Sequence, residues 1–149
     1  MKLDIFKTSA IGLAAVLIAA IPVQAADFEQ AMDYFKSGKY LESAAAFQEL
    51  VDEAPTYDYG HFMLGLSLVK IGKPTDAEAS FLKAIENNGD RFEYHHALAK
   101  SYYDRGEYKK SASTLNTAEA LVGDAANTKY ALYSLRGYCL LYTSDAADD

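Results

Sequence analysis

The middle of the sequence repeats with a period of 34 residues, and this period limits the possible folds more than any other feature. Gly38, Gly72 and Gly106 are spaced 34 positions apart. Five more columns keep the step and alternate small with large side chains: Ala31, Gly65 and Ala99; Tyr34, Leu68 and Tyr102; Ser43, Ala77 and Ser111; Phe47, Phe81 and Leu115; Leu50, Ala84 and Ala118. Such a period is typical of stacked units that bury their apolar faces against one another.

Each unit has the pattern of two helices. In the second unit, apolar residues recur at helical spacing until Gly72, and Pro74 stands where a second helix would begin. The small residues Gly65 and Ala77 allow the two helices to approach closely, beside the large Phe81. Residues 87–89, Asn-Asn-Gly, are expected to end the second helix with a left-handed cap. The sequence therefore predicts an all-α fold.

These columns resemble the tetratricopeptide repeat family over residues 27–124. The resemblance implies a solenoid of antiparallel helix pairs with three 34-residue repeats and a truncated fourth. His61 and His95 stand where the family has an early Trp, and Pro74 replaces the Tyr found at the matching positions 40 and 108. Residues 129–138 fit the first helix of the fourth unit, but aligning Gly137 with Gly65 requires about four extra residues after the third unit.

Residues 1–25 have the pattern of a secretory signal peptide. Lys2 and Lys7 precede an apolar run at residues 11–21, and Val-Gln-Ala at 23–25 suits cleavage between Ala25 and Ala26. The run is shorter than the roughly 20 residues that a membrane-spanning helix needs. We therefore expect a periplasmic or secreted protein with no stable membrane insertion after cleavage.

The last residues, 139–149, resemble the translation of a transposon adapter used in preparing sequencing libraries. They show no clear helical or strand period. We expect a repeat domain at residues 26–138 followed by a non-native tail, with a genuine acidic C-terminus as the alternative.

The resemblance also implies a concave groove, lined by the first helix of each unit. On this basis the predicted partner-binding residues are Tyr59, Phe62, Leu66, Val69, His96, Lys100 and Tyr103. Apolar and aromatic side chains of this kind suit a helix or an extended peptide of a partner protein. The alternative is that several of these side chains pack only against neighbouring helices, which is the expectation for Phe28 and Phe35.

Charge and residue usage argue against other classes of function. The net charge of −7 argues against nucleic acid binding. One Cys and three His residues provide no disulfide and little for a metal site. His95 and His96 point about 100° apart on a helix, while His61 and His95 lie one repeat apart. Asp76 and Glu78 are explained by the helix dipole. We find no phosphate loop or nucleophile elbow, and we expect no catalytic site, metal or cofactor.

The sequence thus predicts a protein–protein interaction module of the bacterial cell envelope. The alternative is a targeting or scaffold domain of a longer exported protein, which could be an enzyme. Self-association through the uncapped C-terminal end of the solenoid is a further possibility.

Overall fold

The computed structural model describes residues 28–145, and these residues form helices joined by short turns. The helices are α1 (Phe28–Lys36), α2 (Tyr40–Glu53), α3 (Asp58–Lys70), α4 (Pro74–Asn87), α5 (Phe92–Asp104), α6 (Tyr108–Glu119) and α7 (Ala126–Asp145). The described part of the chain contains no strand, so the all-α prediction is confirmed. None of its helices is long and apolar enough to cross a membrane. The predicted signal peptide with its cleavage site, and residues 146–149 of the predicted tail, lie outside the described residues.

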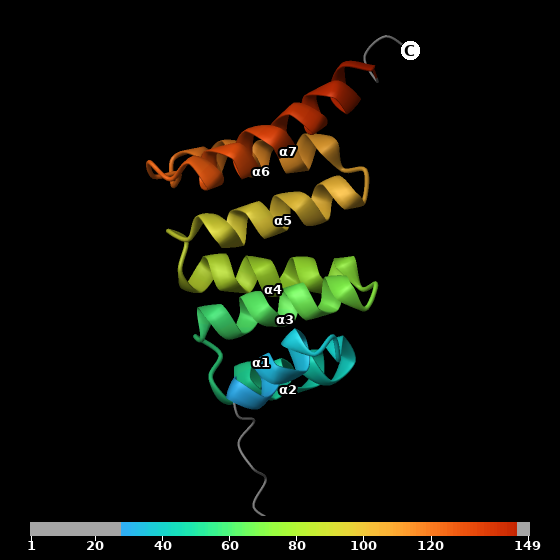
Figure 1. The fold of residues 1–149 in the computed structure, drawn as a ribbon, viewed down its shortest axis with the longest axis vertical. Helices are drawn as coiled ribbons and strands as arrows, with labels where there is room; N and C mark the ends of the chain where they lie inside the picture. The colour runs from blue at the N-terminus through green and yellow to red at the C-terminus, as the bar shows by residue number, and fades with distance from the viewer. Residues whose placement is uncertain (1–27, 146–149) are drawn as a thin grey trace, which may run out of the picture.

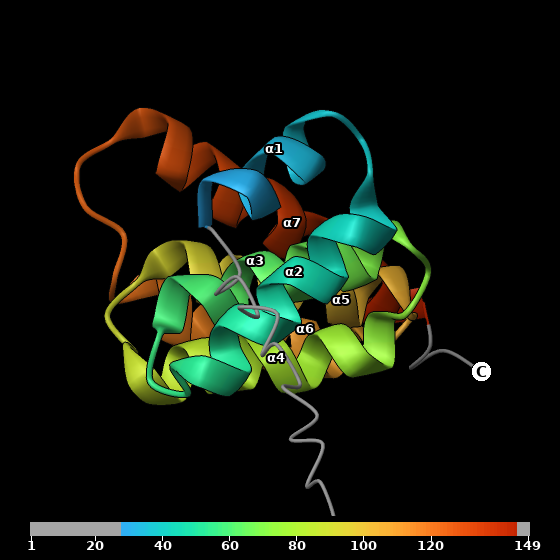
Figure 2. The ribbon, with the colours of Figure 1, turned by 90° about the horizontal axis from the view of Figure 1, so that it is seen from below.

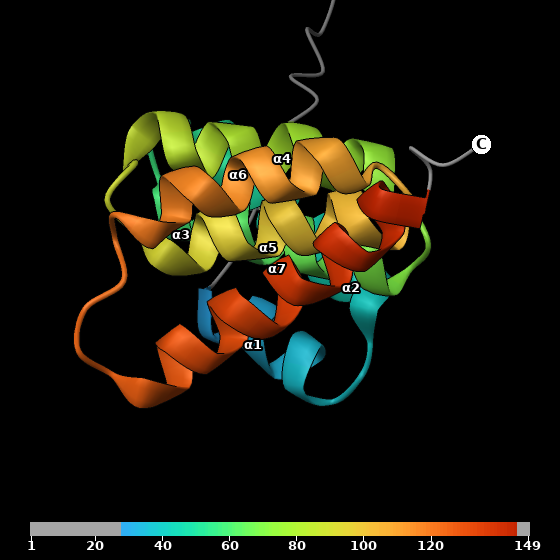
Figure 3. The ribbon, with the colours of Figure 1, turned by 90° about the horizontal axis from the view of Figure 1, so that it is seen from above.

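Consecutive helices pack against each other in an elongated stack (Figure 1). Viewed along the stack, α4 and α6 form an outer layer, with α3 and α5 inside it (Figures 2 and 3). The helices α1 and α7 lie on the side of α3 and α5 that faces away from α4 and α6. The first helices of the units therefore line one face, which α1 and α7 border at its two ends.

One glycine makes the turn between the two helices of each of the first three pairs. Gly38, Gly72 and Gly106 have φ of 74°, 78° and 78°, in the left-handed region that favours glycine. Beside each glycine the next amide donates to a carbonyl five residues back, as from Lys73 to Leu68 at 2.9 Å. This is the Schellman arrangement, which satisfies carbonyls at a helix end.

The second helix of the second unit ends differently from the prediction. Asn88 follows α4 with φ of −153°, and Gly89 is not among the glycines with positive φ, so the predicted left-handed cap is wrong. The asparagines instead bond to the start of the same unit: Asn87 Nδ2 donates to the Pro55 carbonyl at 3.1 Å, and Asn88 Nδ2 donates to Asp58 Oδ2 at 2.9 Å. Side-chain bonds across the helix pair replace the local cap.

The column of small residues lets the two helices of each pair approach closely. Ala31 and Ala99 are completely buried, and a Cβ added to Gly65 would lie 2.5 Å from the Phe81 ring. The large members of the facing column, Phe47, Phe81 and Leu115, are at most 1% exposed. This interdigitation of small and large side chains confirms the packing expected from the repeat.

Buried serines join the helices through hydrogen bonds. Ser43 donates to the Ala31 carbonyl at 3.2 Å, and Ser111 donates to the Ala99 carbonyl at 2.7 Å, one bond in the first pair and one in the third. The Ser43 and Ser67 hydroxyl oxygens lie 3.0 Å apart. Ser101 occupies the column of Ser67, but Ala77 occupies the column of Ser43 and offers no hydroxyl. The buried Ser101 hydroxyl therefore has no hydrogen-bond partner.

Helix α7 shows the register shift that the sequence predicts. Cys139 Sγ donates to the Ser111 hydroxyl at 3.1 Å, so Cys139 fills the place that Ser67 has beside Ser43. Cys139 and Ser111 are 28 positions apart, whereas Ser67 and Ser43 are 24 positions apart. The difference of four residues is the register shift.

The same helix corrects the expectation that residues 139–149 lack a helical pattern. Residues 139–145 continue α7, and Cys139 is completely buried against Leu115 and Leu132. The adapter origin of residues 139–149 stays a prediction.

Candidate functional site

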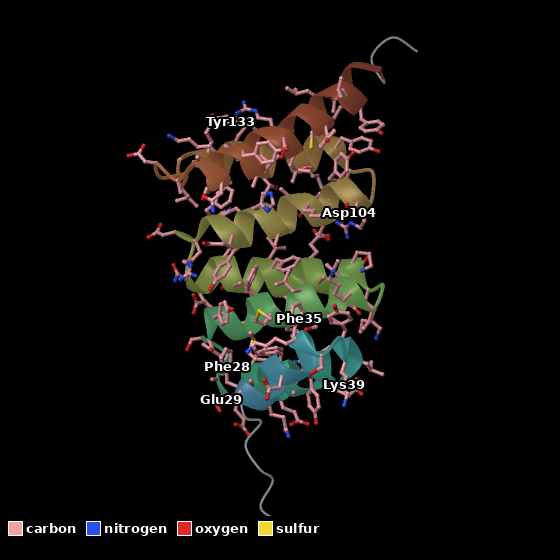
Figure 4. The ribbon with its side chains drawn as sticks, in the orientation of Figure 1. Phe28, Glu29, Phe35, Lys39, Asp104 and Tyr133 are labelled. Atoms are coloured by element: carbon pink, nitrogen blue, oxygen red, sulfur yellow. The ribbon has the colours of Figure 1, made fainter. Side chains whose placement is uncertain are left out.

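The predicted groove residues of α3 belong to an aromatic cluster that joins three repeats. Phe62 lies 4.8 Å from Tyr94 and 5.8 Å from Tyr59 between ring centroids. Tyr59 in turn lies 5.9 Å from Phe28 of α1. Figure 4 shows Phe28 and Phe35 on α1, next to α3. Tyr94 is only 1% exposed and the other rings are partly buried, so packing accounts for much of their surface.

The aliphatic groove residues have a similar role. Leu66 is half-buried and packs against the core of the first pair and against the core between the second and third pairs. Val69 is also half-buried and packs against the second of these cores. The α3 part of the face lined by the first helices is therefore a packed wall.

A recess opens between α5 and α7 on the same face. It is a cavity of about 430 Å³, and its lining residues are His96, Lys100, Tyr103, Tyr130, Ala131, Ser134, Leu135 and Tyr138. The structure thus brings together three of the seven predicted groove residues here, and it places the other four in the aromatic and aliphatic wall of α3. The cavity can accept a bulky apolar side chain.

Sequence reasoning missed the part of the cavity that α7 supplies. With the four-residue shift applied, Ser134 falls in the column of Phe62 and His96, and Tyr138 falls in the column of Leu66 and Lys100. The shift itself was visible from Gly137. Extending the groove columns by 38 instead of 34 residues would have identified Ser134 and Tyr138 as lining residues.

The cavity is close to electrically neutral. Burial lowers the pKa of His96, and the nearby Lys100 charge also lowers it, while a backbone hydrogen bond with Ala131 acts in the opposite direction. The His96 ring stacks on Phe92 at 5.4 Å. The Lys100 ammonium is already paired with Asp104 at 2.8 Å. A neutral imidazole and a paired ammonium favour uncharged ligand groups over an isolated carboxylate.

Tyrosines surround the end of the recess near the C-terminus of α7. Tyr103 lies 6.3 Å from Tyr138 and 6.1 Å from Tyr142, and Tyr142 stacks on Tyr108 at 4.7 Å. Tyrosine provides an apolar ring and a polar hydroxyl with few rotatable bonds, which suits a binding surface. Tyr138 remains 55% exposed and is accessible to a ligand.

The histidines that replace the family's early Trp have structural contacts. His61 Nε2 donates to the Pro55 carbonyl at 2.8 Å, and His95 Nε2 donates to the Gly89 carbonyl at 2.9 Å. Both rings are at most 9% exposed. Each one joins a first helix to the loop that precedes it, which fits the packing role expected for them. Within residues 28–145, no three His, Cys, Asp or Glu side chains are grouped to hold a metal ion.

Two partly buried carboxylates connect successive repeats. Glu78 of α4 accepts hydrogen bonds from Tyr102 at 2.8 Å and from Arg105 at 2.5 Å, so its role goes beyond the helix dipole expected for it. Burial acts to raise the pKa of Glu78, but these two hydrogen bonds, together with the positive charges of Arg105 and Lys110, outweigh burial and lower the pKa. Burial and the Glu78 carboxylate raise the pKa of Tyr102 to about 12.

Asp58 forms the corresponding link at the other end of the helices, where it accepts bonds from Asn88 and Tyr94, both at 2.9 Å. Burial again acts to raise the pKa of Asp58, but the two side-chain hydrogen bonds, together with hydrogen bonds from the backbone at residues 58 and 59, outweigh burial and lower the pKa. Both carboxylates thus serve the packing of one repeat on the next.

Comparisons with known proteins agree with this architecture. Residues 62–131 match the family model described as tetratricopeptide repeat. The TPR2B domain of yeast Sti1, in its pHsp70 complex, superposes with a TM-score of 0.70 and 21% identity, covering 76% of this chain and 92% of that one. The fold is a tetratricopeptide-like solenoid.

Two other solved structures share the solenoid. The Yersinia enterocolitica type III secretion chaperone SycD, in complex with a peptide of the translocator YopD, gives a TM-score of 0.72 with 19% identity, covering 77% of this chain and 90% of that one. The second TPR domain of human RPAP3, in complex with an Hsp70 peptide, gives 0.66 with 16% identity and coverages of 72% and 90%. No curated protein matches the chain.

Proposed function

We propose that this chain is an exported interaction module of the tetratricopeptide repeat family that binds a segment of a partner protein on its concave face. The α5–α7 cavity is the observation that carries the proposal. It lies on the face lined by the first helices, and it combines the predicted residues His96, Lys100 and Tyr103 with aromatic side chains of α7. The similar solenoids of Sti1, SycD and RPAP3 were solved with peptides or partner proteins bound.

The chemistry of the cavity indicates the kind of segment that fits. Its lining is mainly aromatic and aliphatic, and its one ammonium, that of Lys100, is paired with Asp104. We therefore expect the partner segment to place a bulky apolar side chain in the cavity and to lie with its uncharged backbone along the α3 wall. A catalytic role is not part of the proposal, because Asp58, Glu78, His61 and His95 are all engaged in bonds that hold the repeats together.

Peptide selection tests the binding site directly. A displayed library of random 12-residue peptides is selected on the whole chain, and the enriched peptides are titrated by fluorescence polarisation. Tyr103→Ala and Tyr138→Ala should each weaken binding roughly tenfold, as expected for aromatic residues at the centre of an interface. Tyr133→Ala is the matched control, because Tyr133 is also an exposed tyrosine of α7 but lies outside the cavity lining. Equal affinities for all three variants would contradict the proposal.

The proposed location is the bacterial cell envelope, supported by the signal-peptide pattern of residues 1–25. Expression of the full chain in a bacterium, followed by N-terminal sequencing of the periplasmic extract, should yield a protein beginning at Ala26. A product that begins at Met1 and sediments with membranes would contradict export. The alternative of a scaffold domain in a longer exported protein predicts the same binding site.

A further inference from the structure

The α5–α7 cavity is an elongated trough. Helices α5 and α7 run side by side in the same direction (Figures 1 and 3). On α5 the lining extends from His96 to Tyr103, and on α7 it extends from Tyr130 to Tyr138. At a rise of 1.5 Å per residue, the two walls are about 10 Å and about 12 Å long. All of the lining residues precede the predicted non-native tail, so the trough belongs to the predicted repeat domain of residues 26–138.

The trough has an aliphatic floor and aromatic ends. Leu135 is 8% exposed and Ala131 is half-buried, so these two side chains form the floor. Tyr130 and Tyr138 are 77% and 55% exposed, and they stand at the two ends of the α7 wall. Tyr103 lies beside Tyr138 at a centroid distance of 6.3 Å. An occupant therefore meets aliphatic surface below it and a phenol ring at each end.

The polar groups of the lining are mainly neutral hydrogen-bonding groups. The hydroxyls of Tyr130 and Tyr138 belong to exposed side chains and can donate to a ligand. Ser134 donates its proton to a backbone carbonyl of α7 at 3.2 Å, which leaves its oxygen as an acceptor. The Lys100 ammonium lies 2.8 Å from an oxygen of Asp104. The lining thus suits an uncharged occupant that presents free backbone carbonyls to the tyrosines.

The common modes of peptide recognition differ in whether the ligand offers free carbonyls. A helical ligand bonds most of its carbonyls internally. A strand ligand needs the edge of a sheet, and residues 28–145 contain no strand. An acidic motif needs unpaired cations. A polyproline II segment has no internal hydrogen bonds, so its carbonyls are free, and aromatic side chains typically line the grooves that bind it. This conformation therefore matches the chemistry of the trough.

The dimensions of the polyproline II conformation also match the trough. With three residues per turn and a rise of 3.1 Å per residue, two residues three positions apart lie about 9 Å from each other on the same edge of the helix. This spacing fits within walls of about 10 to 12 Å. A trough contacts two of the three edges of such a helix. One edge can then present prolines while the next presents an apolar side chain.

We propose that the α5–α7 trough binds a proline-rich segment of the partner protein, of the form Pro-x-x-Pro with an apolar residue between the prolines, in the polyproline II conformation. The inference rests on the proposed function, because it specifies the segment that the same site binds. The two prolines pack towards the tyrosines at the ends of the trough, and the apolar side chain lies on Leu135. The hydroxyls of Tyr130 and Tyr138 donate to carbonyls of the segment.

A labelled peptide of sequence GSPPLPPLPPLGS is the probe, and its binding to the whole chain is measured by fluorescence polarisation. Two control peptides separate backbone conformation from apolar content. GSAALAALAALGS keeps the leucines but favours a helix, and the mirror-image peptide made of D-amino acids keeps the composition but reverses the hand of the helix. The proline peptide of L-amino acids should bind at least tenfold more tightly than either control.

Variants of the chain test the tyrosines. Replacing Tyr130 and Tyr138 together by Phe removes two hydroxyls but keeps the rings, and it should weaken binding of the proline peptide roughly threefold to tenfold. Tyr133→Phe is the matched control and should leave binding unchanged, because Tyr133 is an exposed tyrosine of α7 outside the lining. Thermal unfolding of each variant checks that the fold is retained.

Three results would overturn the inference. The first is equal affinity for the proline peptide and the two control peptides, which would mean that apolar content alone governs binding. The second is unchanged affinity in the double Phe variant. The third is a set of library peptides that depend on Tyr138 but are not displaced by the proline peptide, and this result would leave the proposed function standing. If neither the library peptides nor the proline peptide respond to Tyr103→Ala or Tyr138→Ala, the proposed function fails as well.

Discussion

Helices α3 and α7 are both first helices of a repeat, yet they have different surroundings. Helix α3 packs against α2 on one side and α4 on the other, whereas α7 packs against α6 and has no described helix on its outer side. Glycine occupies the same column in both. Gly65 is required because Phe81 leaves no room for a Cβ, while Gly137 has open space. The physical meaning of a residue in a repeat column therefore depends on the neighbour that it faces.

The face lined by the first helices shows a second contrast between α3 and α7. The aromatic residues of α3 are partly buried by contacts with one another and with Tyr94, whereas those of α7 line an open cavity. Packing and binding thus use the same residue types at equivalent positions. Mutations can separate the two roles, because removing a packing side chain should mainly lower stability, whereas removing a binding side chain should mainly lower affinity.

The largest difference should come from removing a large side chain at each interface. Phe81→Ala should lower the free energy of unfolding by about 3–5 kcal/mol, because it leaves a cavity above Gly65. Leu140→Ala should lower it by less than about 1 kcal/mol, because Leu140 is 56% exposed. Urea unfolding followed by circular dichroism measures both values. Similar losses for the two variants would show that the outer face of α7 is covered in solution.

The glycine pair should respond with opposite signs. Gly65→Ala should destabilise the fold by about 1–3 kcal/mol, since its Cβ would lie 2.5 Å from the Phe81 ring. Gly137→Ala should stabilise it by about 0.4–1 kcal/mol, because alanine is the better helix former and finds no obstruction. The midpoints of chemical unfolding report both changes. A loss of stability in Gly137→Ala would contradict the open environment of this position.

A smaller effect is expected from the buried serines. Ser67→Ala should cost about 1 kcal/mol, since Ser67 donates to the Met63 carbonyl at 2.8 Å and lies beside Ser43. Ser101→Ala should be neutral within about 0.5 kcal/mol or stabilising, because the buried Ser101 hydroxyl has no partner. Thermal unfolding of the two variants measures the difference. Adding Ala77→Ser to the unaltered chain should supply the missing hydroxyl, provided that the helix pair keeps its spacing.

The smallest effect concerns pH and the cavity beside α7. The pKa of His96 is lowered in the fold from the ordinary value of 6.5, mainly by burial. The unfolded chain therefore binds more protons between the two pKa values, and stability falls as the pH drops from 6.5 towards the folded-state pKa. His96→Gln should flatten this part of the stability profile, measured as melting temperature between about pH 7.5 and 5.5.

The carboxylates act in a lower pH range and provide an internal control. Asp58 and Glu78 have pKa values below the ordinary 3.8 and 4.5, so their stabilising effect is present above these values and is lost as the pH falls below them. Acid unfolding in that range should persist in His96→Gln. An unchanged slope near pH 6 in this variant would show that His96 does not titrate as its burial suggests.

Much of the fold could be predicted because several columns of the repeat hold residues whose size or backbone preference indicates a helix end or a close contact. The glycines that end the first helices, the small residues between paired helices and Pro74 at the start of α4 all have the predicted roles. The register of α7 was also evident from Gly137. These features depend on the backbone and on close approach, which leave a strong signal in residue size.

The site was less predictable because it depends on how side chains share space between repeats. Phe62 and Tyr103 occupy related columns of the same face, but Phe62 meets Tyr94 while Tyr103 borders a cavity. Glu78 reaches Arg105 across the repeat boundary, and Asn88 reaches Asp58. Such contacts join residues about 30 positions apart, and the periodicity of a single helix does not indicate them.

The order of helix contacts also bears on how the molecule is assembled. Nearly every helix packs against the helices just before and just after it in the chain. Contacts between elements so close in sequence require only short loops to close, and folding of such chains is fast. When the chain is synthesised from its N-terminus, each helix pair can fold before the residues of the next pair have emerged. The cavity between α5 and α7 needs α7, so it becomes competent for binding later than the α3 wall does.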